Sequence, residues 1–305
     1  MKNYIKKWLV YRNEFIRRKV EYNMKIVSTI QEVRECVNAW KKEGQTVGFV
    51  PTMGYLHEGH MSLVDAAREN DKVVVSIFVN PMQFGPNEDL ASYPRDLERD
   101  ANMCKEHGVD LIFHPTPEEM YGENFYSYVD MNVLTQELCG LTRPIHFRGV
   151  CTVVTKLFNI VAPDKAYFGQ KDAQQLAIIR RMVKDLNMPL EIIGCPIVRE
   201  EDGLAKSSRN TYLSEEERKA ALVLSRAVFL AKDMIEKGER NASVILKAMT
   251  TEIEKEQLAK IDYVKAVDLD TIQQVDFIQG DVLVAIAVYI GKTRLIDNVV
   301  VKACS

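Results

Sequence analysis

Residues 51–60 read PTMGYLHEGH, and their two histidines stand where a predicted strand gives way to a predicted helix. The strand is TVGFVP (46–51), a short apolar run rich in β-branched residues. The helix covers residues 59–70. Open α/β sheets bind ligands just beyond the carboxyl ends of their strands. We therefore expect the residues around His57 and His60 to line a ligand site.

Strands and helices continue to alternate along the chain. Further apolar runs predict strands at residues 72–80, 109–113, 165–168 and 190–198. Helical periodicity covers residues 29–44, 95–107, 146–161 and 172–186. The strands are almost entirely apolar, which is typical of parallel strands covered on both faces. The sequence thus predicts an α/β fold, with a doubly wound, Rossmann-like parallel sheet over residues 24–199.

The pattern changes after residue 199. Residues 200–213 form a polar loop, and Ser214 followed by Glu217 is a capping box that opens a helix ending near Gly238. A second helix is predicted over 241–259. Three strands with hairpin-like turns are predicted at residues 261–269, 281–290 and 293–301. We expect residues 200–305 to form a smaller α+β domain that acts as a lid.

The composition excludes several classes of protein. The chain has 305 residues with a formal net charge of −3, which does not favour binding to nucleic acid. Its longest apolar runs are too short to span a bilayer. The six cysteines form no C-x-x-C pair, so we expect reduced thiols in a cytoplasmic protein. Residues 1–23 are basic and are interpreted as a loosely ordered extension.

Three kinds of site can explain the histidine pair. The spacing HEGH differs from the zinc motif H-E-x-x-H, and a third ligand would have to come from a distant part of the chain. Local turn bonds could also satisfy both rings. A phosphate site explains more residues, because Gly54 admits a close approach and the helix N-terminus after Gly59 favours an anion. We assign no metal ligands.

Three more motifs narrow the interpretation. FVNPMQFG (78–85), FGQKDAQQ (168–175) and KSSRN (206–210) follow PTMGYLHEGH in that order. The H-x-G-H pattern resembles the nucleotidylyltransferase superfamily, and the four motifs together resemble the pantothenate synthetase (pantoate–β-alanine ligase) family over residues 24–305. The resemblance implies ATP-dependent condensation of pantoate with β-alanine through pantoyl adenylate, releasing AMP and pyrophosphate. It also implies Mg²⁺ and a homodimer.

The resemblance also implies the roles of individual residues. His57, His60, Lys171 and Arg209 are the implied catalytic residues, with His60 as the proton donor. Pantoate is assigned to Gln83 and Gln175, and β-alanine to Gln83. The residues implied for ATP are Met53, Gly54, Tyr55, Leu56, His57, Glu58, Gly59, His60, Gly169, Gln170, Lys171, Asp172, Val198, Lys206, Ser207, Ser208 and Arg209.

Simpler explanations exist for the later motifs. Asn-Pro in FVNPMQFG is a common turn, Asp172 is a good helix N-cap, and a loop such as KSSRN is usually solvated surface. Lys171, however, stands at a predicted helix start, where the dipole disfavours a cation unless an anion binds there. Two amides also hold a nucleophilic carboxylate without lowering its energy as strongly as an arginine would.

Other residues and functions stay open. His146, with Arg143 and Arg148, and the helical Asp100 receive no role in the site, although Asp100 is a candidate for holding Mg²⁺. A nucleotidylyltransferase that leaves the nucleotide attached to its product is the second enzyme hypothesis. A nucleotide-binding module without catalytic activity is the third.

Overall fold

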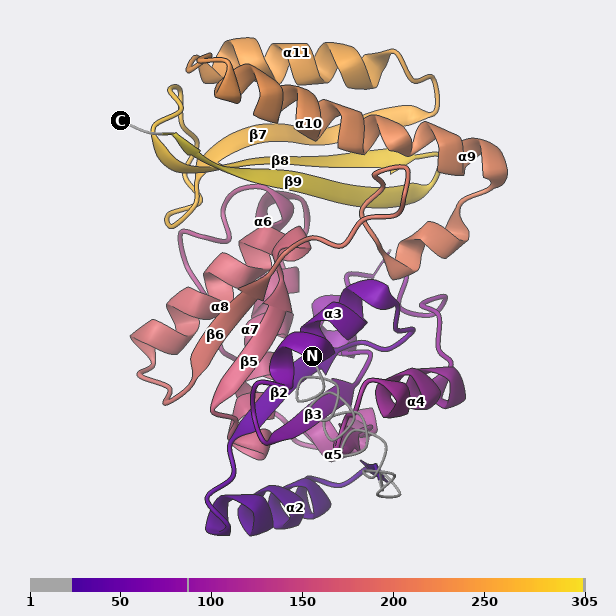
Figure 1. The fold of residues 1–305 in the computed structure, drawn as a ribbon, viewed down its shortest axis with the longest axis vertical. Coiled ribbons are helices and arrows are strands. Elements are labelled where there is room, and N and C mark those ends of the chain that lie inside the picture. The colour runs from indigo at the N-terminus through magenta and orange to yellow at the C-terminus, as the bar shows by residue number, and fades with distance from the viewer. Residues whose placement is uncertain (1–23, 87, 304–305) are drawn as a thin grey trace, which may run out of the picture.

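Within the described residues, six parallel strands form the larger of two sheets and three antiparallel strands form the smaller one. The computed structural model describes residues 24–86 and 88–303, so the prediction for residues 1–23 lies outside the described residues. Figure 1 shows the two sheets stacked along the long axis of the molecule. The predicted α/β fold class, with its smaller α+β part, is confirmed.

The order of the strands creates a ligand position at the centre of the larger sheet. In chain order the strands are β1 (Lys25–Val27), β2 (Val47–Thr52), β3 (Lys72–Ile77), β4 (Leu111–Phe113), β5 (Lys165–Gly169) and β6 (Glu191–Cys195). In space they run β1-β4-β3-β2-β5-β6. The chain leaves β2 toward one edge and later returns through β5 on the other side. Ligands of open α/β sheets bind at such a switch point, beyond the carboxyl ends of the two strands.

Helices cover both faces of this sheet. On one face pack α2 (Ile30–Lys42), α7 (His146–Val161) and α8 (Ala173–Asp185), and on the other pack α3 (Glu58–Ala67) and α4 (Leu97–Glu106). Neighbouring residues of β2 show the alternation, since Phe49 belongs to the first core and Val50 to the second. The connections also contain short helical turns, which are α5 (Pro117–Tyr121), α6 (Cys139–Thr142), η1 (Pro81–Gln83), η2 (Gln170–Asp172) and η3 (Ser208–Tyr212).

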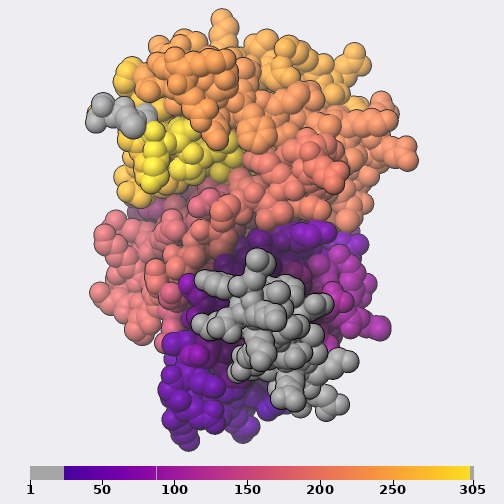
Figure 2. All heavy atoms as spheres, viewed as in Figure 1, coloured from indigo at the N-terminus to yellow at the C-terminus, as the bar shows by residue number. Residues whose placement is uncertain are grey.

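The smaller sheet is buried on both of its faces. Its strands are β7 (Ala259–Asp268), β8 (Gly280–Ile290) and β9 (Thr293–Ala303), and its helices are α9 (Glu215–Ala220), α10 (Leu222–Glu236) and α11 (Ala242–Glu254). Val284 packs under these helices, whereas Leu283 and Ala285 join the core of the larger sheet. This double burial explains why β8 is almost entirely apolar. Figure 2 shows this part at one end of the molecule, in orange and yellow.

Several elements differ from the sequence-based expectation. Strand β1 was not predicted, because three residues at a sheet edge carry too little pattern. The capping box at Ser214 is present, but the helix predicted to run to Gly238 is divided at Ala221, where no glycine or proline marks the break. The next helix ends at Glu254, because Ala259 already begins β7. No helix in the described part of the chain is long and apolar enough to cross a membrane.

Candidate active site

A strained turn connects β2 to α3 at the switch point. Gly54 and Tyr55 both have positive φ, at 86° and 50°. Asp100 of α4 holds the turn, since its two carboxylate oxygens accept hydrogen bonds from the backbone N–H groups of Tyr55 and Leu56, each at 2.7 Å. A Cβ atom on Gly54 would lie 2.9 Å from Cγ2 of Ile77, so only glycine fits. Hydrogen bonds to Asp100 and close packing against Ile77 together fix the conformation of the turn.

The two histidines cap the helix that follows this turn. Nδ1 of His57 accepts a hydrogen bond from the Gly59 N–H at 3.1 Å, and Nδ1 of His60 accepts one from the His57 N–H at 3.3 Å. The ring centroids lie 4.1 Å apart. Because each Nδ1 accepts, a neutral ring carries its hydrogen on Nε2. Both rings therefore offer an Nε2–H donor, and both line a cavity.

Burial and nearby cations keep both rings neutral in the free protein. Desolvation, followed by Lys171, Lys206 and Arg99, lowers the pKa of His57 to about 4. Desolvation, followed by the neighbouring His57, lowers the pKa of His60 well below its ordinary value. The cations that surround His57 make the same place favourable for an anion.

The connection between β5 and α8 reaches the same cavity. Here η2 carries Lys171 and Asp172, and Asn298 of β9 donates from Nδ2 to the carbonyl oxygens of Gln170 at 3.1 Å and Lys171 at 2.8 Å. Asp172 stands at the N-cap position of α8, but its side chain makes no cap hydrogen bond, so the simpler explanation of this residue as a helix cap is wrong. Within the described residues, this carboxylate makes no hydrogen bond or ion pair, and it lines the cavity.

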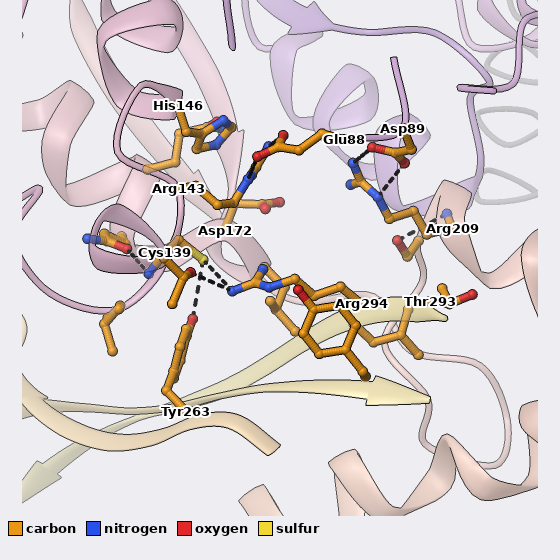
Figure 3. A pocket seen from close by; sticks show the side chains of 18 of the residues that line it. Glu88, Asp89, Cys139, Arg143, His146, Asp172, Arg209, Tyr263, Thr293 and Arg294 are labelled. Carbon is orange, nitrogen blue, oxygen red and sulfur yellow. Dashed lines mark hydrogen bonds and ion pairs between the residues drawn. The ribbon is translucent and has the colours of Figure 1, made fainter. Parts of the chain in front are cut away.

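The KSSRN loop closes one side of the cavity and is not simply solvated surface. Ser208 is buried and its Oγ donates to the carbonyl oxygen of Tyr55 at 3.2 Å. Nζ of Lys206 lies 3.1 Å from the carboxylate of Glu58. Arg209 forms a two-point ion pair with Asp89, both contacts at 2.9 Å (Figure 3). The loop is therefore tied to the histidine turn in the present structure.

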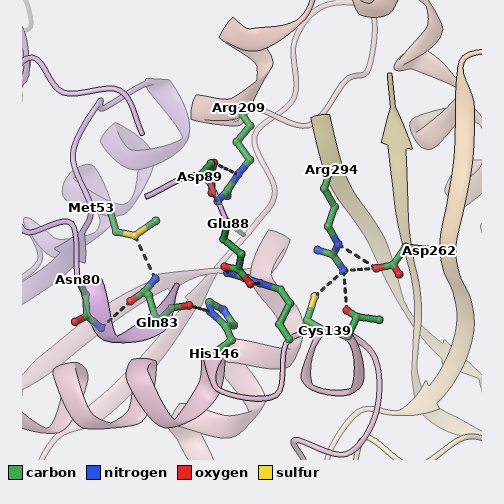
Figure 4. A network of polar contacts seen from close by, with 12 residues as sticks. Met53, Asn80, Gln83, Glu88, Asp89, Cys139, His146, Arg209, Asp262 and Arg294 are labelled. Atoms are coloured by element: carbon green, nitrogen blue, oxygen red, sulfur yellow. Dashed lines mark hydrogen bonds and ion pairs between the residues drawn. The ribbon is translucent and has the colours of Figure 1, made fainter. Parts of the chain in front are cut away.

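The glutamine after β3 faces the cavity from the opposite side. Gln83 is buried in η1, with Nε2 3.2 Å from Sδ of Met53 and Oε1 3.1 Å from Nδ2 of Asn80 (Figure 4). Gln175 lines the same cavity. Its neighbour Gln174 instead donates to the carbonyl oxygens of Leu134 and Glu137 and has a structural role.

These groups enclose a cavity of about 230 Å³ at the carboxyl ends of β2 and β5. A second cavity of about 1100 Å³ adjoins it between the two sheets and shares Lys171 and Arg209 with it. Most residues predicted to form the site line the smaller cavity: Met53, His57, Gly59, His60, Gln83, Gly169, Lys171, Asp172, Gln175, Val198, Lys206, Ser207, Ser208 and Arg209. Those that line neither cavity are Gly54, Tyr55, Leu56, Glu58 and Gln170.

Arg143 and His146, which the sequence patterns assign to no role, also line the smaller cavity. Arg143 pairs with Glu88 through its Nε at 2.9 Å and through a second short contact. Nδ1 of His146 lies 3.0 Å from the carbonyl oxygen of Gln83, so Nδ1 donates and Nε2 is left unprotonated in the neutral ring. Desolvation, followed by Arg143, lowers the pKa of His146 to about 4. Residues 143–150, RPIHFRGV, combine two arginines with a histidine, but this pattern alone does not show that His146 contacts Gln83.

No three His, Cys, Asp or Glu side chains gather as a metal site in residues 24–86 and 88–303. The arrangement instead offers cations and N–H donors to an anion, beside amides that suit a small polar acid.

Comparison with known proteins matches this geometry to a family. The sequence profile of the pantoate–β-alanine ligase family matches residues 25–300. A pantothenate synthetase of Ruminiclostridium cellulolyticum is 67% identical over 275 residues, which cover 90% of this chain and 98% of the relative. The chain belongs to the pantoate–β-alanine ligase family. A pantothenate synthetase of Clostridium botulinum is 60% identical to this ligase, over 92% of the chain and 100% of the relative.

Solved structures agree with this membership. The crystal structure of pantothenate synthetase from Thermus thermophilus matches the ligase with a TM-score of 0.86 and 47% identity, covering 90% of this chain and 99% of that one. A pantoate–β-alanine ligase from Francisella tularensis, complexed with β-γ ATP and β-alanine, matches with a TM-score of 0.74 and 35% identity, covering 90% and 97%. The expected family is confirmed.

Proposed function

We propose that this ligase condenses pantoate with β-alanine in two steps at the cavity between β2 and β5. A carboxylate oxygen of pantoate first attacks the α-phosphorus of ATP, and pyrophosphate leaves. The amine nitrogen of β-alanine then attacks the carbonyl carbon of pantoyl adenylate, AMP leaves, and the amine loses a proton. The observation that carries the proposal is the convergence of the four sequence motifs on one cavity at the switch point.

The residues at the histidine turn are proposed to bind the phosphates. The Nε2–H groups of His57 and His60 donate to phosphate oxygens, and Lys171 supplies a positive charge beside them. A ring whose pKa lies well below its ordinary value holds little proton at pH 7. We therefore propose that His60 meets ATP as a neutral ring whose Nε2–H donates a hydrogen bond to the developing charge.

The KSSRN loop is proposed to complete the phosphate site. Ser207 supplies a hydroxyl group, and Arg209 supplies a guanidinium that Asp89 holds in place. Ser208 holds the loop near the phosphates through its bond to the Tyr55 carbonyl oxygen. The smaller sheet is proposed to act as a lid that keeps water from the adenylate, with residues 200–305 as the domain. Contacts such as Asn298 to the Lys171 turn support this, because they join the two parts at the cavity.

Mg²⁺ is proposed to enter together with ATP. Such ions are bound mainly by phosphate oxygens, with one or two protein carboxylates. Asp172 fits this role, because its carboxylate lies at the cavity without a hydrogen bond or ion pair among the described residues. Asp100 does not fit, because both of its oxygens accept backbone hydrogen bonds. Bound Mg²⁺ would neutralise charge on the phosphates.

Pantoate is proposed to bind between Gln83 and Gln175, with β-alanine also beside Gln83. Both amides line the smaller cavity, and the apolar wall near them is supplied by Val150, Val153 and Leu157. A mixed apolar and amide wall suits a branched hydroxy acid. A homodimer and a cytoplasmic location stay predictions, and light scattering of the purified protein would check the first.

The decisive experiment measures AMP release in the presence of ATP and Mg²⁺. We expect release that requires both pantoate and β-alanine, and exchange of labelled pyrophosphate into ATP that requires pantoate alone. A nucleotidylyltransferase would leave the nucleotide attached to its product. Pyrophosphate exchange without pantoate, or a rate of AMP release that does not depend on β-alanine, would contradict the proposed reaction.

A further inference from the structure

The amide of Asn80, in the wall of the smaller cavity, has a fixed orientation. Asn80 is 1% exposed. Its Oδ1 accepts a hydrogen bond from the Met82 N–H at 3.2 Å, and its Nδ2 donates to the carbonyl oxygen of Gly149 at 3.1 Å. A backbone N–H can only donate and a backbone carbonyl can only accept. The oxygen and nitrogen of this amide therefore cannot be exchanged without losing two hydrogen bonds.

The fixed amide of Asn80 also determines the orientation of the Gln83 amide. The same Nδ2 lies 3.1 Å from Oε1 of Gln83, which must accept because Nδ2 can only donate. The NH₂ group of Gln83 is then directed to the other side, where Sδ of Met53 lies at 3.2 Å (Figure 4). A thioether sulfur is a weak acceptor, so the NH₂ group keeps donor capacity for a ligand.

Tyr121, the last residue of α5, is hydrogen-bonded to Asn80 and so completes a chain of contacts from Tyr121 through Asn80 to Gln83. Its hydroxyl lies 2.5 Å from Oδ1 of Asn80. The ring is fixed by Phe78 and Phe125, with centroids 6.2 and 5.0 Å away. Burial raises the pKa of the phenol well above its ordinary value, so the hydroxyl keeps its hydrogen and donates.

We propose that Tyr121 and Asn80 are positioning residues that set the polarity of Gln83, so that its NH₂ group meets an oxygen of pantoate. This inference rests on the proposed contact between Gln83 and pantoate. An amide without such support can turn by 180° and present its carbonyl oxygen, which repels a carboxylate. The Tyr121–Asn80–Gln83 chain removes that alternative before the substrate arrives, which is a form of preorganisation.

The main test replaces Asn80 by an isosteric residue that, when ionised, has no hydrogen to donate. In Asn80→Asp, Gln83 gains by turning its NH₂ group toward the new carboxylate, and its oxygen then faces pantoate. We expect the KM for pantoate to rise by about tenfold or more, as for sites whose designed hydrogen bond is lost. The KM for ATP should stay within about twofold, because no phosphate-binding residue has changed.

A double-mutant cycle separates reorientation of Gln83 from simple charge repulsion. The change Asn80→Asp is measured again in a Gln83→Ala background. If the introduced carboxylate acts through the amide of Gln83, it adds little to the KM for pantoate once that amide is gone. An equal effect in both backgrounds would show direct repulsion and would overturn the proposal.

Tyr121→Phe provides a milder variant, in case the buried carboxylate prevents folding. Oδ1 of Asn80 still accepts the hydrogen bond from the Met82 N–H in this variant. We therefore expect a smaller rise in the KM for pantoate, about two- to fivefold, and no change in the KM for ATP. Tyr126→Phe is the matched control, because that residue is exposed and, among the described residues, its hydroxyl hydrogen-bonds only to Asn124. Equal KM values for pantoate in the two variants would contradict the role of Tyr121.

Different patterns of KM values for pantoate would contradict the positioning role and the proposed pantoate site. If Gln83→Ala leaves the KM for pantoate unchanged, Gln83 does not bind pantoate and the proposed site is wrong there. If Gln83→Ala raises it while Tyr121→Phe and Asn80→Asp do not, only the positioning role is wrong.

Discussion

Glycine at position 59 allows the capping histidine to fold back against the helix start. A Cβ atom there would lie 2.8 Å from Cε1 and 2.9 Å from Nδ1 of His57. Neither distance is tolerated by real side chains, so the imidazole would have to move. The hydrogen bond from the Gly59 N–H to the ring would be lost with it. Gly59 therefore allows the ring of His57 to take the position in which its Nε2–H group lines the cavity.

Gly59→Ala tests this placement. We expect kcat/KM for ATP to fall by about 10²-fold, the usual cost of misplacing a catalytic group by about 1 Å. Steady-state kinetics with saturating pantoate and β-alanine measures it. Asp65→Ala, on the exposed part of the same helix, should keep normal kinetics. Normal kinetics in Gly59→Ala would show that catalysis does not depend on the ring of His57 lying against the Gly59 N–H group.

The neutral state of the histidines makes stability depend on pH. The pKa of His57 is lowered from 6.5 to about 4 in the folded protein. Between these values the unfolded chain binds a proton that the folded chain does not, so the free energy of unfolding falls as the pH is lowered from 6.5 toward 4. His57→Asn keeps a favoured N-cap residue but does not titrate. Its unfolding free energy, from urea titrations at pH 5 and 7, should change less than that of the wild type, and an equal change would contradict the shift.

At the scale of elements, α4 supports the turn that carries the histidines. Asp100 is 1% exposed and joins α4 to the backbone of Tyr55 and Leu56. Asparagine has one acceptor oxygen, so Asp100→Asn would direct an NH₂ group at one of those N–H groups. We expect kcat/KM for ATP to fall by about 10- to 10²-fold through the misplaced turn.

The dependence on Mg²⁺ distinguishes this support from metal binding. In Asp100→Asn the Mg²⁺ concentration that gives half the maximal rate should equal that of the wild type, measured at fixed ATP. An increased requirement for Mg²⁺ would show that Asp100 holds the metal. Asp172→Asn is the matched comparison, and there the requirement should rise.

Sequence patterns predicted the elements with strong periodicity. Helices such as α7 and the apolar strand β8 have one pattern over many residues, because burial imposes it at each turn. The short β1 and the break at Ala221 have no comparable signal. The contact of Asp100 with the histidine turn was also missed, because a helix position does not show whether a carboxylate faces a distant backbone.

At the scale of the molecule, the site depends on contacts between distant parts of the chain. The first three motifs could be predicted, because each follows a strand and parallel strands end at one edge. KSSRN instead lies in the loop after β6. The pair Arg209–Asp89 joins residues 120 positions apart, and the bond from Asn298 to Lys171 spans 127. Neither partner is marked by local sequence, since Asp89 lies in an irregular loop and Asn298 in the middle of a strand. Such pairs follow only from the packing of distant segments in the folded chain.

Asn298 provides the final prediction, because it connects the smaller sheet to the lysine turn. It is 4% exposed and donates to two carbonyl oxygens of that turn. Its removal leaves both acceptors without this donor, a loss of about 1–3 kcal/mol, so Asn298→Ala should raise the KM for ATP by about tenfold. The KM for pantoate should change less, since Gln83 and Gln175 keep their places. Asn159→Ala is the matched control, because it removes a similar bond from an exposed amide to the Thr155 carbonyl on α7. If Asn298→Ala lowers thermal stability while leaving the KM for ATP unchanged, the contact holds the fold together without positioning Lys171.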